Sequence, residues 1–345
     1  AKKKQAKERI ASSEADIAIG THALIQESVA FANLGLVIVD EQHRFGVEQR
    51  AELRRKGART DLLVMTATPI PRSLALTAYG DLDVSLIKQK PSNRIPIKTL
   101  VLPESRMNGV YSSMEKYIAE GRQCYYVLPL IEESAKSDLA SAKEVHGELS
   151  SEIFKHRRVG LLHGRMKADE KSEVMTAFKD GRLDILVSTT VIEVGIDVPN
   201  ASVIVIRHPE RFGLSQLHQL RGRVGRGAHQ SFCILLHPDN VSFEAKERLC
   251  VLAKSDDGFV IAEEDLKMRG AGDFLGTRQH GLSSQFEFAD LARDLDLLLE
   301  ARAEAERLVE LCPDAAEGMK DFEKKYIRSE EVTGSRLSRS LSLIS

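Results

Sequence analysis

Apolar positions along the chain gather in short continuous runs, and longer segments with helical spacing separate these runs. Three runs begin at Asp16, Leu34 and Asp61. After the proline-containing stretch Lys88 to Lys98 come five more, which read CYYVLPLI, VGLLHG, DILVSTT, SVIVIRH and FCILLH. A run of Val, Ile and Leu without alternation is typical of a strand buried on both faces of a parallel sheet. We therefore predict an α/β protein with two parallel sheets. Because proline disfavours both helix and ladder pairing, Lys88 to Lys98 is the predicted linker.

The pattern changes after His237. Residues Asn240 to Gly281 predict two helices around the turn SDDG, followed by a glycine-rich loop. Helical spacing returns from Phe286, and the final residues RSLSLIS have the composition of a frayed terminus.

Composition narrows the class of protein. The 345 residues are enough for about two domains, and 42% hydrophobic with 29% charged residues describes a soluble globular chain. The formal charge of −2 means that any nucleic-acid contact must come from local patches. The four cysteines form no CxxC pair, which argues against a zinc site or a disulfide framework and favours a cytoplasmic setting. No apolar run reaches membrane-spanning length, and the N-terminus lacks the pattern of a signal peptide.

Candidate chemistry begins at the end of the second apolar run, where Asp40 and Glu41 stand side by side. Ligands of open α/β sheets bind beyond the carboxyl ends of the strands, so the two carboxylates are candidate site residues. Taken alone, the pair is better explained as the point where a strand reaches solvent. The next run ends in TATPIPR, Thr66 to Arg72.

The second half of the chain contributes polar groups of a different kind. In STTVIEVGID, Gly195 and Asp197 are expected just beyond a strand, and in QLRGRVGRG, Arg223 and Arg226 are three residues apart. Three residues are about one helical turn, so both guanidinium groups are expected to face the same way and to fit a polyphosphate. A surface salt bridge is the alternative for the arginines. The order of these groups favours nucleotide hydrolysis shared between two domains. One carboxylate would hold magnesium through water, its neighbour would activate the attacking water, and the arginines would stabilise the transferred phosphoryl group.

The segments VDEQHRFG, TATPIPR, LLHGRM, STTVIEVGIDVPNA and QLHQLRGRVGRG resemble, in order and spacing, the later motifs of superfamily 2 helicases, most closely the RecG family. The resemblance runs from about Asp16 to Gly281 and includes the long match DGFVIAEEDLKMRGAGDFLGTRQHG. It implies two RecA-like motor lobes, residues 1–90 and 91–239. A helical hairpin with a translocation loop (240–282) and a C-terminal helical segment (283–345) would follow.

The resemblance also implies roles for individual residues. The implied catalytic residues are the Walker B pair Asp40 and Glu41, with magnesium held through water, and the arginine-finger motif Gln219, Arg223 and Arg226. ATP would be bound by Asp40, His43, Gly195 and Asp197. DNA binding or coupling would fall to Thr21, His22, Thr66, Thr68, Thr189, Thr190, Arg248, Arg269 and Gln279. His163 is interpreted as mainly structural.

The function implied is that of an ATP- and magnesium-dependent DNA helicase, a monomeric double-stranded DNA translocase that remodels stalled forks and Holliday junctions in recombination and repair. Its expected partners are branched double-stranded DNA and single-stranded DNA-binding protein, without a membrane. Two alternatives stay open. The motor of the transcription-repair coupling factor shares the hairpin, although the sequence DEQH and the short C-terminal region favour RecG. The other alternative is a DNA-binding or interaction module without ATPase activity.

One motif of the resemblance is missing. The phosphate-binding loop GxxxxGK[ST] should precede the acidic pair, yet the chain has no Gly-Lys dipeptide. We therefore expect a C-terminal motor fragment that lacks the Walker A loop and the N-terminal wedge domain, and that is inactive by itself.

Overall fold

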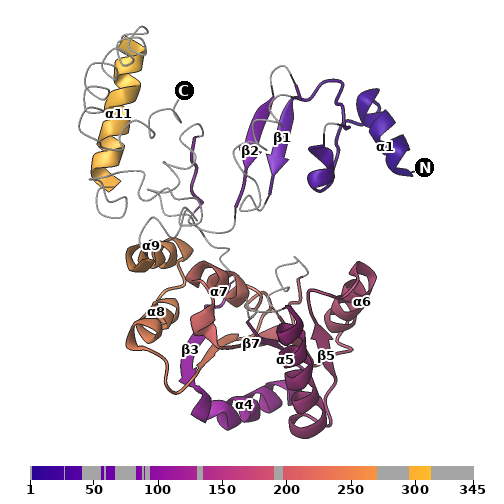
Figure 1. Ribbon diagram of the computed structural model, residues 1–345, viewed down its shortest axis with the longest axis vertical. Coiled ribbons are helices and arrows are strands. Elements are labelled where there is room, and N and C mark those ends of the chain that lie inside the picture. The colour runs from indigo at the N-terminus through magenta and orange to yellow at the C-terminus, as the bar shows by residue number, and fades with distance from the viewer. Residues whose placement is uncertain are drawn as a thin grey trace. The chain divides into compact units, whose positions relative to one another are not determined.

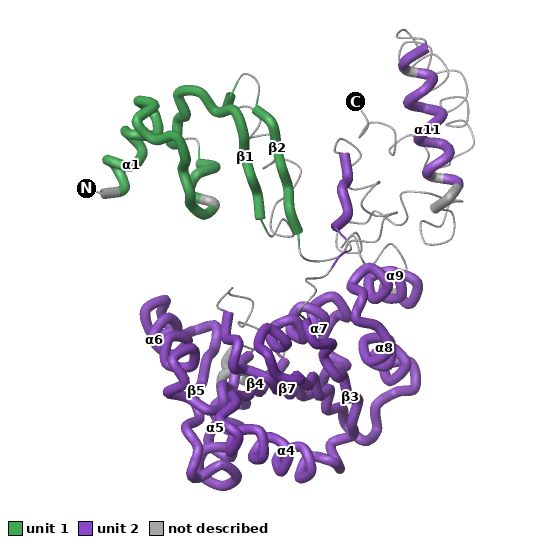
Figure 2. Tube along the Cα trace, turned by 180° about the vertical axis from the view of Figure 1, so that it is seen from behind, with its two compact units in different colours: residues 1–69 green, residues 70–345 purple. Residues whose placement is uncertain are grey.

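The structure is a computed structural model, and it describes residues 2–26, 28–40, 56–57, 60–66, 83–87, 89, 94–129, 135–189, 197–269 and 295–311. The chain divides into two compact units, residues 1–69 and 70–345 (Figure 2). Each unit is described by itself below.

The first unit contains a small parallel sheet. Strands β1 (Leu36–Val39) and β2 (Asp61–Val64) pair in register, and helix α1 (Lys2–Ala11) and the 3₁₀ turn η1 (His22–Leu24) precede them (Figure 1). Val39 is buried on one face of the sheet together with Ile25. On the other face Ile38 is 56% exposed. The two later apolar runs of this region therefore form strands, as predicted, with one face covered among the described residues.

The run that begins at Asp16 forms no strand, so this part of the prediction is wrong. Ile17 and Ile19 are 81% and 95% exposed. Period-two alternation places both side chains on one face, but an extended segment is stabilised only when a neighbouring strand pairs with its backbone. Among the described residues of this unit, β1 and β2 pair only with each other.

The second unit is built on a six-stranded parallel sheet in the order β3-β8-β7-β4-β6-β5. Its strands are β3 (Lys98–Pro103), β4 (Gln123–Val127), β5 (Val159–Leu162), β6 (Ile185–Ser188), β7 (Ala201–Arg207) and β8 (Phe232–His237). Five of these strands coincide with predicted runs. The sequence analysis missed β3 because it lies at the edge of the sheet, where exposed and half-buried positions alternate and Leu100 is 44% exposed.

The longer helices of the second unit follow in chain order, and all but the last of them contribute residues to the clusters on the two faces of the sheet (Figure 1). They are α4 (Met107–Ala119), α5 (Ala135–Glu148), α6 (Ala168–Lys179), α7 (Leu214–Arg221), α8 (Phe243–Lys254), α9 (Gly258–Arg269) and α11 (Leu295–Leu311). Shorter helical turns are η3 (Glu104–Arg106), η4 (Leu149–Ile153) and η6 (Pro209–Arg211). The predicted pair of helices around SDDG is confirmed as α8 and α9. No helix in the described part of the chain is long and apolar enough to cross a membrane.

Alternate residues of the central strands enter two separate cores. Tyr125 and Val127 of β4 pack in a cluster with residues of α6, α7, α8 and α9. Cys124 and Tyr126 pack on the opposite face with residues of α4, α5 and η4. Both faces of the strands are therefore covered, which confirms the interpretation of continuous apolar runs as strands of a doubly covered parallel sheet.

Candidate functional site

The segment after α7 lies at the amino-terminal edge of the six-stranded sheet. Gly225 adopts a φ of +79°, and a Cβ atom there would lie 2.7 Å from Ile97, the residue before β3. The Gly225 N–H donates to Ser231 Oγ over 3.1 Å, just before β8. A Cβ atom at Gly227 would lie 2.3 Å from the carbonyl oxygen of Pro199, shortly before β7. Glycine is needed at these positions because a side chain would force the loop away from the sheet.

This geometry corrects the expectation that Arg223 and Arg226 share a helical face. Helix α7 ends at Arg221, and both arginines lie in the turn that follows it. Gly222 is the C-cap of the helix, and the positive φ of Gly225 turns the chain again three residues later. Gln219 lies on α7 itself and is half-buried.

The two arginines nevertheless gather around one point. Burial raises the pKa of Tyr125 to about 12, Arg223 and Arg226 lower it, and Asp197 raises it. The pKa of Tyr125 thus responds to all three charges.

Arg226 also contacts Asp197 directly. Arg226 Nη1 lies 3.5 Å from Asp197 Oδ1, and Arg226 Nε donates to the carbonyl oxygen of Gly222 over 3.1 Å. The side chains of Arg226 and Asp197 are 30% and 55% exposed, so their polar ends are accessible to a ligand. Asp197 was expected just beyond a strand. It lies instead in the connection that leads into β7, at the edge opposite to the end of β6.

The carboxyl-terminal edge of the same sheet holds a second group of polar side chains. Thr189 directly follows β6, and its N–H donates to the carbonyl oxygen of Leu162 over 3.3 Å. Its hydroxyl is buried without a hydrogen-bond partner among the described residues. Next to Leu162, burial lowers the pKa of His163, and the nearby Lys143 and Lys171 lower it further.

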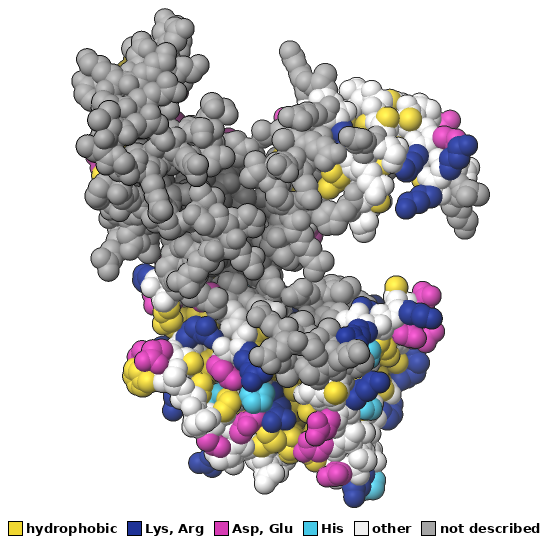
Figure 3. Space-filling model, viewed as in Figure 1, with side chains coloured by type: hydrophobic (Ala, Val, Ile, Leu, Met, Phe, Trp, Pro, Cys, Tyr) yellow, Lys and Arg dark blue, Asp and Glu magenta, His cyan; other side chains and the backbone are white. Residues whose placement is uncertain are grey.

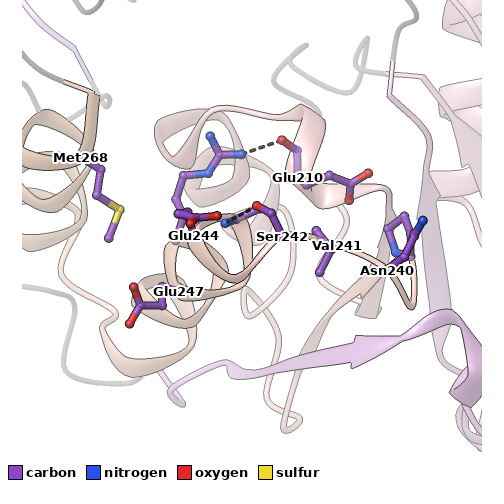
Figure 4. A pocket seen from close by; sticks show the side chains of 10 residues that line it. Glu210, Asn240, Val241, Ser242, Glu244, Glu247 and Met268 are labelled. Carbon is purple, nitrogen blue, oxygen red and sulfur yellow. Dashed lines mark hydrogen bonds between the residues drawn. The ribbon is translucent and has the colours of Figure 1, made fainter.

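Arg248 fixes the hairpin to a corner of the sheet. From α8, its Nη2 donates to the carbonyl oxygens of Glu210 over 2.6 Å and Phe212 over 3.3 Å. Glu210, Ser242, Glu247 and Arg248 are among the residues that line a cavity of about 680 Å³ between η6 and α8 (Figure 4). This guanidinium group thus binds backbone carbonyl oxygens of the protein itself.

The sequence analysis missed Arg221, the first arginine of the same motif. It is 2% exposed, and its Nη1 donates to the carbonyl oxygens of Leu252 over 2.6 Å and Ser255 over 2.9 Å. The carboxylate of Asp256, in the turn between α8 and α9, lies 3.3 Å away. Burial lowers the pKa of Arg221, and Asp256 opposes this effect. Its position was detectable in the sequence, because it continues the apolar stripe of Leu214 and Leu217 at helical spacing.

The first unit supplies fewer described site residues. Asp40 and Thr66 are exposed and follow β1 and β2, and the neighbouring strand ends are held together by a 2.8 Å hydrogen bond from the Met65 N–H to the Val39 carbonyl oxygen. Thr21 is exposed and directly precedes η1. Outside the described residues lie Glu41, His43, Thr68, Thr190, Gly195, Gln279 and the side chains of His22 and Arg269. Within the described ranges, no group of three or more His, Cys, Asp and Glu residues could hold a metal ion.

Three family models match successive parts of the chain. Residues 1–77 match DEAD/DEAH box helicase, residues 111–228 match the helicase conserved C-terminal domain, and residues 255–330 match ATP-dependent DNA helicase RecG, domain 3, C-terminal.

Individual relatives carry the same name. The ATP-dependent DNA helicase RecG of Thermotoga maritima is 55% identical over 306 residues, which cover 89% of this chain and 39% of that protein. The Escherichia coli K12 protein of the same name is 50% identical over 317 residues, covering 90% of this chain and 46% of the relative. The chain thus spans less than half the length of these relatives.

Solved structures agree with this. A structure of RecG bound to a three-way DNA junction superposes with a TM-score of 0.66 at 52% identity, covering 86% of this chain and 38% of that one. The Mycobacterium smegmatis helicase Lhr, solved with single-stranded DNA and AMP-PNP, has a TM-score of 0.50 at 15% identity and covers 68% of this chain and 32% of its own, which indicates a shared fold alone.

Proposed function

Because this chain belongs to the RecG family of DNA helicases, we propose that it forms most of the motor of an ATP-dependent translocase that remodels branched double-stranded DNA. The relatives' name and the three-way junction in one of their structures support this proposal. The proposed boundaries are those of the sequence analysis: motor lobes at residues 1–90 and 91–239, the hairpin and its loop at 240–282, and a helical segment at 283–345.

The observation that carries the proposal is the contact between Arg226 and Asp197 at the amino-terminal edge of the sheet, in the same turn as Arg223. Guanidinium groups donate paired hydrogen bonds to phosphate oxygens, and a carboxylate accepts hydrogen bonds from ribose hydroxyls. This donor set fits a nucleoside triphosphate. Bound ATP supplies the phosphoryl group, while Arg223 and Arg226 stabilise the negative charge that develops on it.

The carboxylates that we assign to catalysis belong to the first unit. Asp40 stands at the carboxyl end of β1, where it can hold magnesium through a water molecule, which suits an ion that keeps several waters and phosphate oxygens as ligands. We assign Glu41 as the base that orients and deprotonates the attacking water. His43 and Gly195 are proposed as further nucleotide contacts.

The DNA contacts would lie elsewhere. We assign Thr21, His22, Thr66, Thr68, Thr189 and Thr190 to the DNA backbone or to coupling. Arg248, Arg269 and Gln279 are assigned to the link between the hairpin and its loop. Thr189 lies at the carboxyl-terminal edge of the sheet and Arg226 at the amino-terminal edge, which supports separate nucleotide and DNA sites on the second unit. Because the Thr189 hydroxyl is buried, the role proposed for this residue is coupling.

The alternatives are weaker. The model for RecG domain 3 matches residues 255–330, which favours RecG over the coupling factor. An inactive DNA-binding module would not require an accessible arginine, Arg226, beside an accessible carboxylate, Asp197.

The test uses the extended protein, by which we mean this chain joined to the further sequence that its relatives carry, including the phosphate-binding loop. Arg226→Ala should lower DNA-stimulated ATP turnover by about 10³-fold, because an arginine finger stabilises transition-state charge. The control is Arg182→Ala, since Arg182 forms an exposed ion pair with Asp180 at 3.2 Å. If Arg226→Ala lowers turnover less than about tenfold, Arg226 is only a surface salt bridge, worth about 1 kcal/mol at most.

A further inference from the structure

Residues Thr21 to Val29 of the first unit form two consecutive turns. The Leu24 N–H donates to the Thr21 carbonyl oxygen over 3.0 Å, and the Val29 N–H donates to the Gln26 carbonyl oxygen over 2.9 Å. Ile25 and Val29 are buried, at 8% and 3% exposure, whereas Thr21 is exposed. The turns are anchored on their apolar side and present Thr21 to solvent.

The side chain of Lys56 closes the second turn from outside. Lys56 Nζ donates to the carbonyl oxygens of Gln26 over 2.8 Å and Val29 over 2.9 Å. An ammonium group carries three N–H donors, so one lysine can join both ends of a turn. The carbonyl oxygen of Gln26 accepts from both Lys56 and Val29, and the lysine is half-buried. This differs from a surface lysine, whose flexible side chain is free in water.

The backbone beside Lys56 is fixed as well. A Cβ atom at the next residue, Gly57, would lie 2.3 Å from Thr60 Oγ1 and 2.6 Å from the carbonyl oxygen of Leu34. Thr60 Oγ1 itself donates to the Leu34 carbonyl oxygen over 3.1 Å. Leu34 lies just before β1. This close packing therefore fixes the backbone at Lys56 relative to the sheet.

We propose that Lys56 is a positioning residue for DNA binding: it holds the turn from Gln26 to Val29 relative to β1, and through that turn the preceding one, which carries Thr21 and His22. The proposal rests on the DNA contact proposed above for these two residues. Lys56 holds the turn through two backbone carbonyl oxygens. Its effect on the turn therefore does not depend on the side chains of the turn. Its ammonium group is directed to the protein and does not itself neutralise a DNA phosphate.

Lys7 provides a matched control. It lies on α1, where Lys and Arg side chains gather at the surface of the first unit (Figure 3). Lys7 Nζ donates over 2.7 Å to the Ser28 hydroxyl, in the same segment, but this contact is exposed. Removing either lysine removes one positive charge, whereas only Lys56 joins the ends of the turn.

The experiment compares Lys56→Met, Lys56→Arg, Lys7→Met and Thr21→Val in the extended protein. Affinity for a fluorescent three-way DNA junction is measured by anisotropy at several salt concentrations, and ATP turnover is measured at saturating junction. We expect Lys56→Met to weaken binding about tenfold, the size expected for losing roughly one charged hydrogen bond. We expect Lys7→Met to weaken it about twofold or less and Lys56→Arg to restore part of the loss. Turnover at saturating DNA should stay within about twofold in Lys56→Met.

The salt dependence separates positioning from direct contact. A lysine that neutralises a phosphate lowers the slope of log K against log salt by about 1 when it is removed. An unchanged slope in Lys56→Met supports the proposal. A slope reduced by about 1, or an affinity equal to that of the unchanged protein, overturns it.

Hydrogen exchange gives an independent measurement. In Lys56→Met, the amides of Leu24 and Val29 should exchange at least about tenfold faster while those of β1 and β2 keep their rates. Unchanged exchange at Leu24 and Val29 overturns the proposal, as does equal acceleration throughout the unit, which indicates general destabilisation. If Thr21→Val leaves DNA affinity unchanged, the DNA contact of Thr21 under the proposed function fails. The exchange measurement still decides whether Lys56 holds the turn.

Discussion

The two sheets of the protein are built from similar apolar runs but are covered differently. In the six-stranded sheet, alternate residues of β4 enter separate cores, and Tyr125 and Tyr126 are 1% and 0% exposed. In the two-stranded sheet, Val39 is 6% exposed while its neighbour Ile38 is 56% exposed. A run such as LVIV therefore predicts a strand. It does not predict whether one face of that strand or both faces are covered by other segments.

The difference extends to the candidate sites. In the small sheet, Asp40 and Thr66 follow strands that pair with each other, so adjacent strand ends bring them near one edge. In the large sheet, Arg226 and Asp197 lie at the amino-terminal edge and Thr189 at the carboxyl-terminal edge. The larger sheet thus offers ligands two edges, one at each end of its strands, and the length of the strands separates them.

The largest expected effect is the loss of ATP hydrolysis when the two sheets lack a phosphate-binding loop. The 345-residue chain has no Gly-Lys dipeptide, so we expect no measurable DNA-stimulated ATP hydrolysis from it alone. Phosphate release with and without a three-way junction measures this, with the extended protein as the positive control. Turnover by the chain alone at ordinary motor rates would show that the residues of the two sheets suffice.

A smaller effect, on the free energy of unfolding, tests directly whether both faces of a strand are covered. Leu235→Ala, in β8 at 0% exposure, should lower the free energy of unfolding by about 2–5 kcal/mol, because it leaves a cavity in the core. Ile38→Ala, at a position 56% exposed, should change it by about 0.5 kcal/mol. Urea unfolding followed by circular dichroism measures both values. An equal loss in the two variants would mean that the second face of β1 is also covered.

The smallest effect is a pH dependence confined to the large sheet. Burial by itself raises the pKa of Asp184, but hydrogen bonds from the side chain and backbone N–H of Arg158 outweigh it and hold the pKa below its usual range. A carboxyl group with a lowered folded-state pKa stabilises the protein above its unfolded pKa, about 3.9, and loses this contribution as the pH falls through the folded value.

Asp184→Asn should therefore cost about 1 kcal/mol at pH 7, a value reduced by the 57% exposure of Arg158, and less at about pH 3. Urea unfolding at the two pH values measures the difference. Asp180→Asn is the control, because Asp180 forms a more exposed pair with Arg182. A cost for Asp184→Asn that is the same at both pH values contradicts the assignment.

The local chemistry of several elements was predictable. The continuous runs predicted five strands of the large sheet, and the SDDG turn between apolar-patterned segments predicted α8 and α9. Arg223, Arg226 and Asp197 were identified by residue type and order. The prediction that the two arginines share a helical face was wrong, because α7 ends at Arg221, with Gly222 as its C-cap, before either of them. Arg221 was missed because its partners, Leu252, Ser255 and Asp256, are about 30 residues away.

The sequence by itself determined where most of the strands form, which residues carry charge and in which order the motifs follow one another. These properties depend on neighbours within a few positions, through backbone preference and the period of burial. Tertiary structure decided which charges meet. Arg226 faces Asp197 because Gly227 lets its loop approach Pro199, and Lys56 reaches Gln26 and Val29 because Gly57 packs against Leu34. Such contacts join residues about 30 positions apart, and no local pattern encodes a distance across the fold.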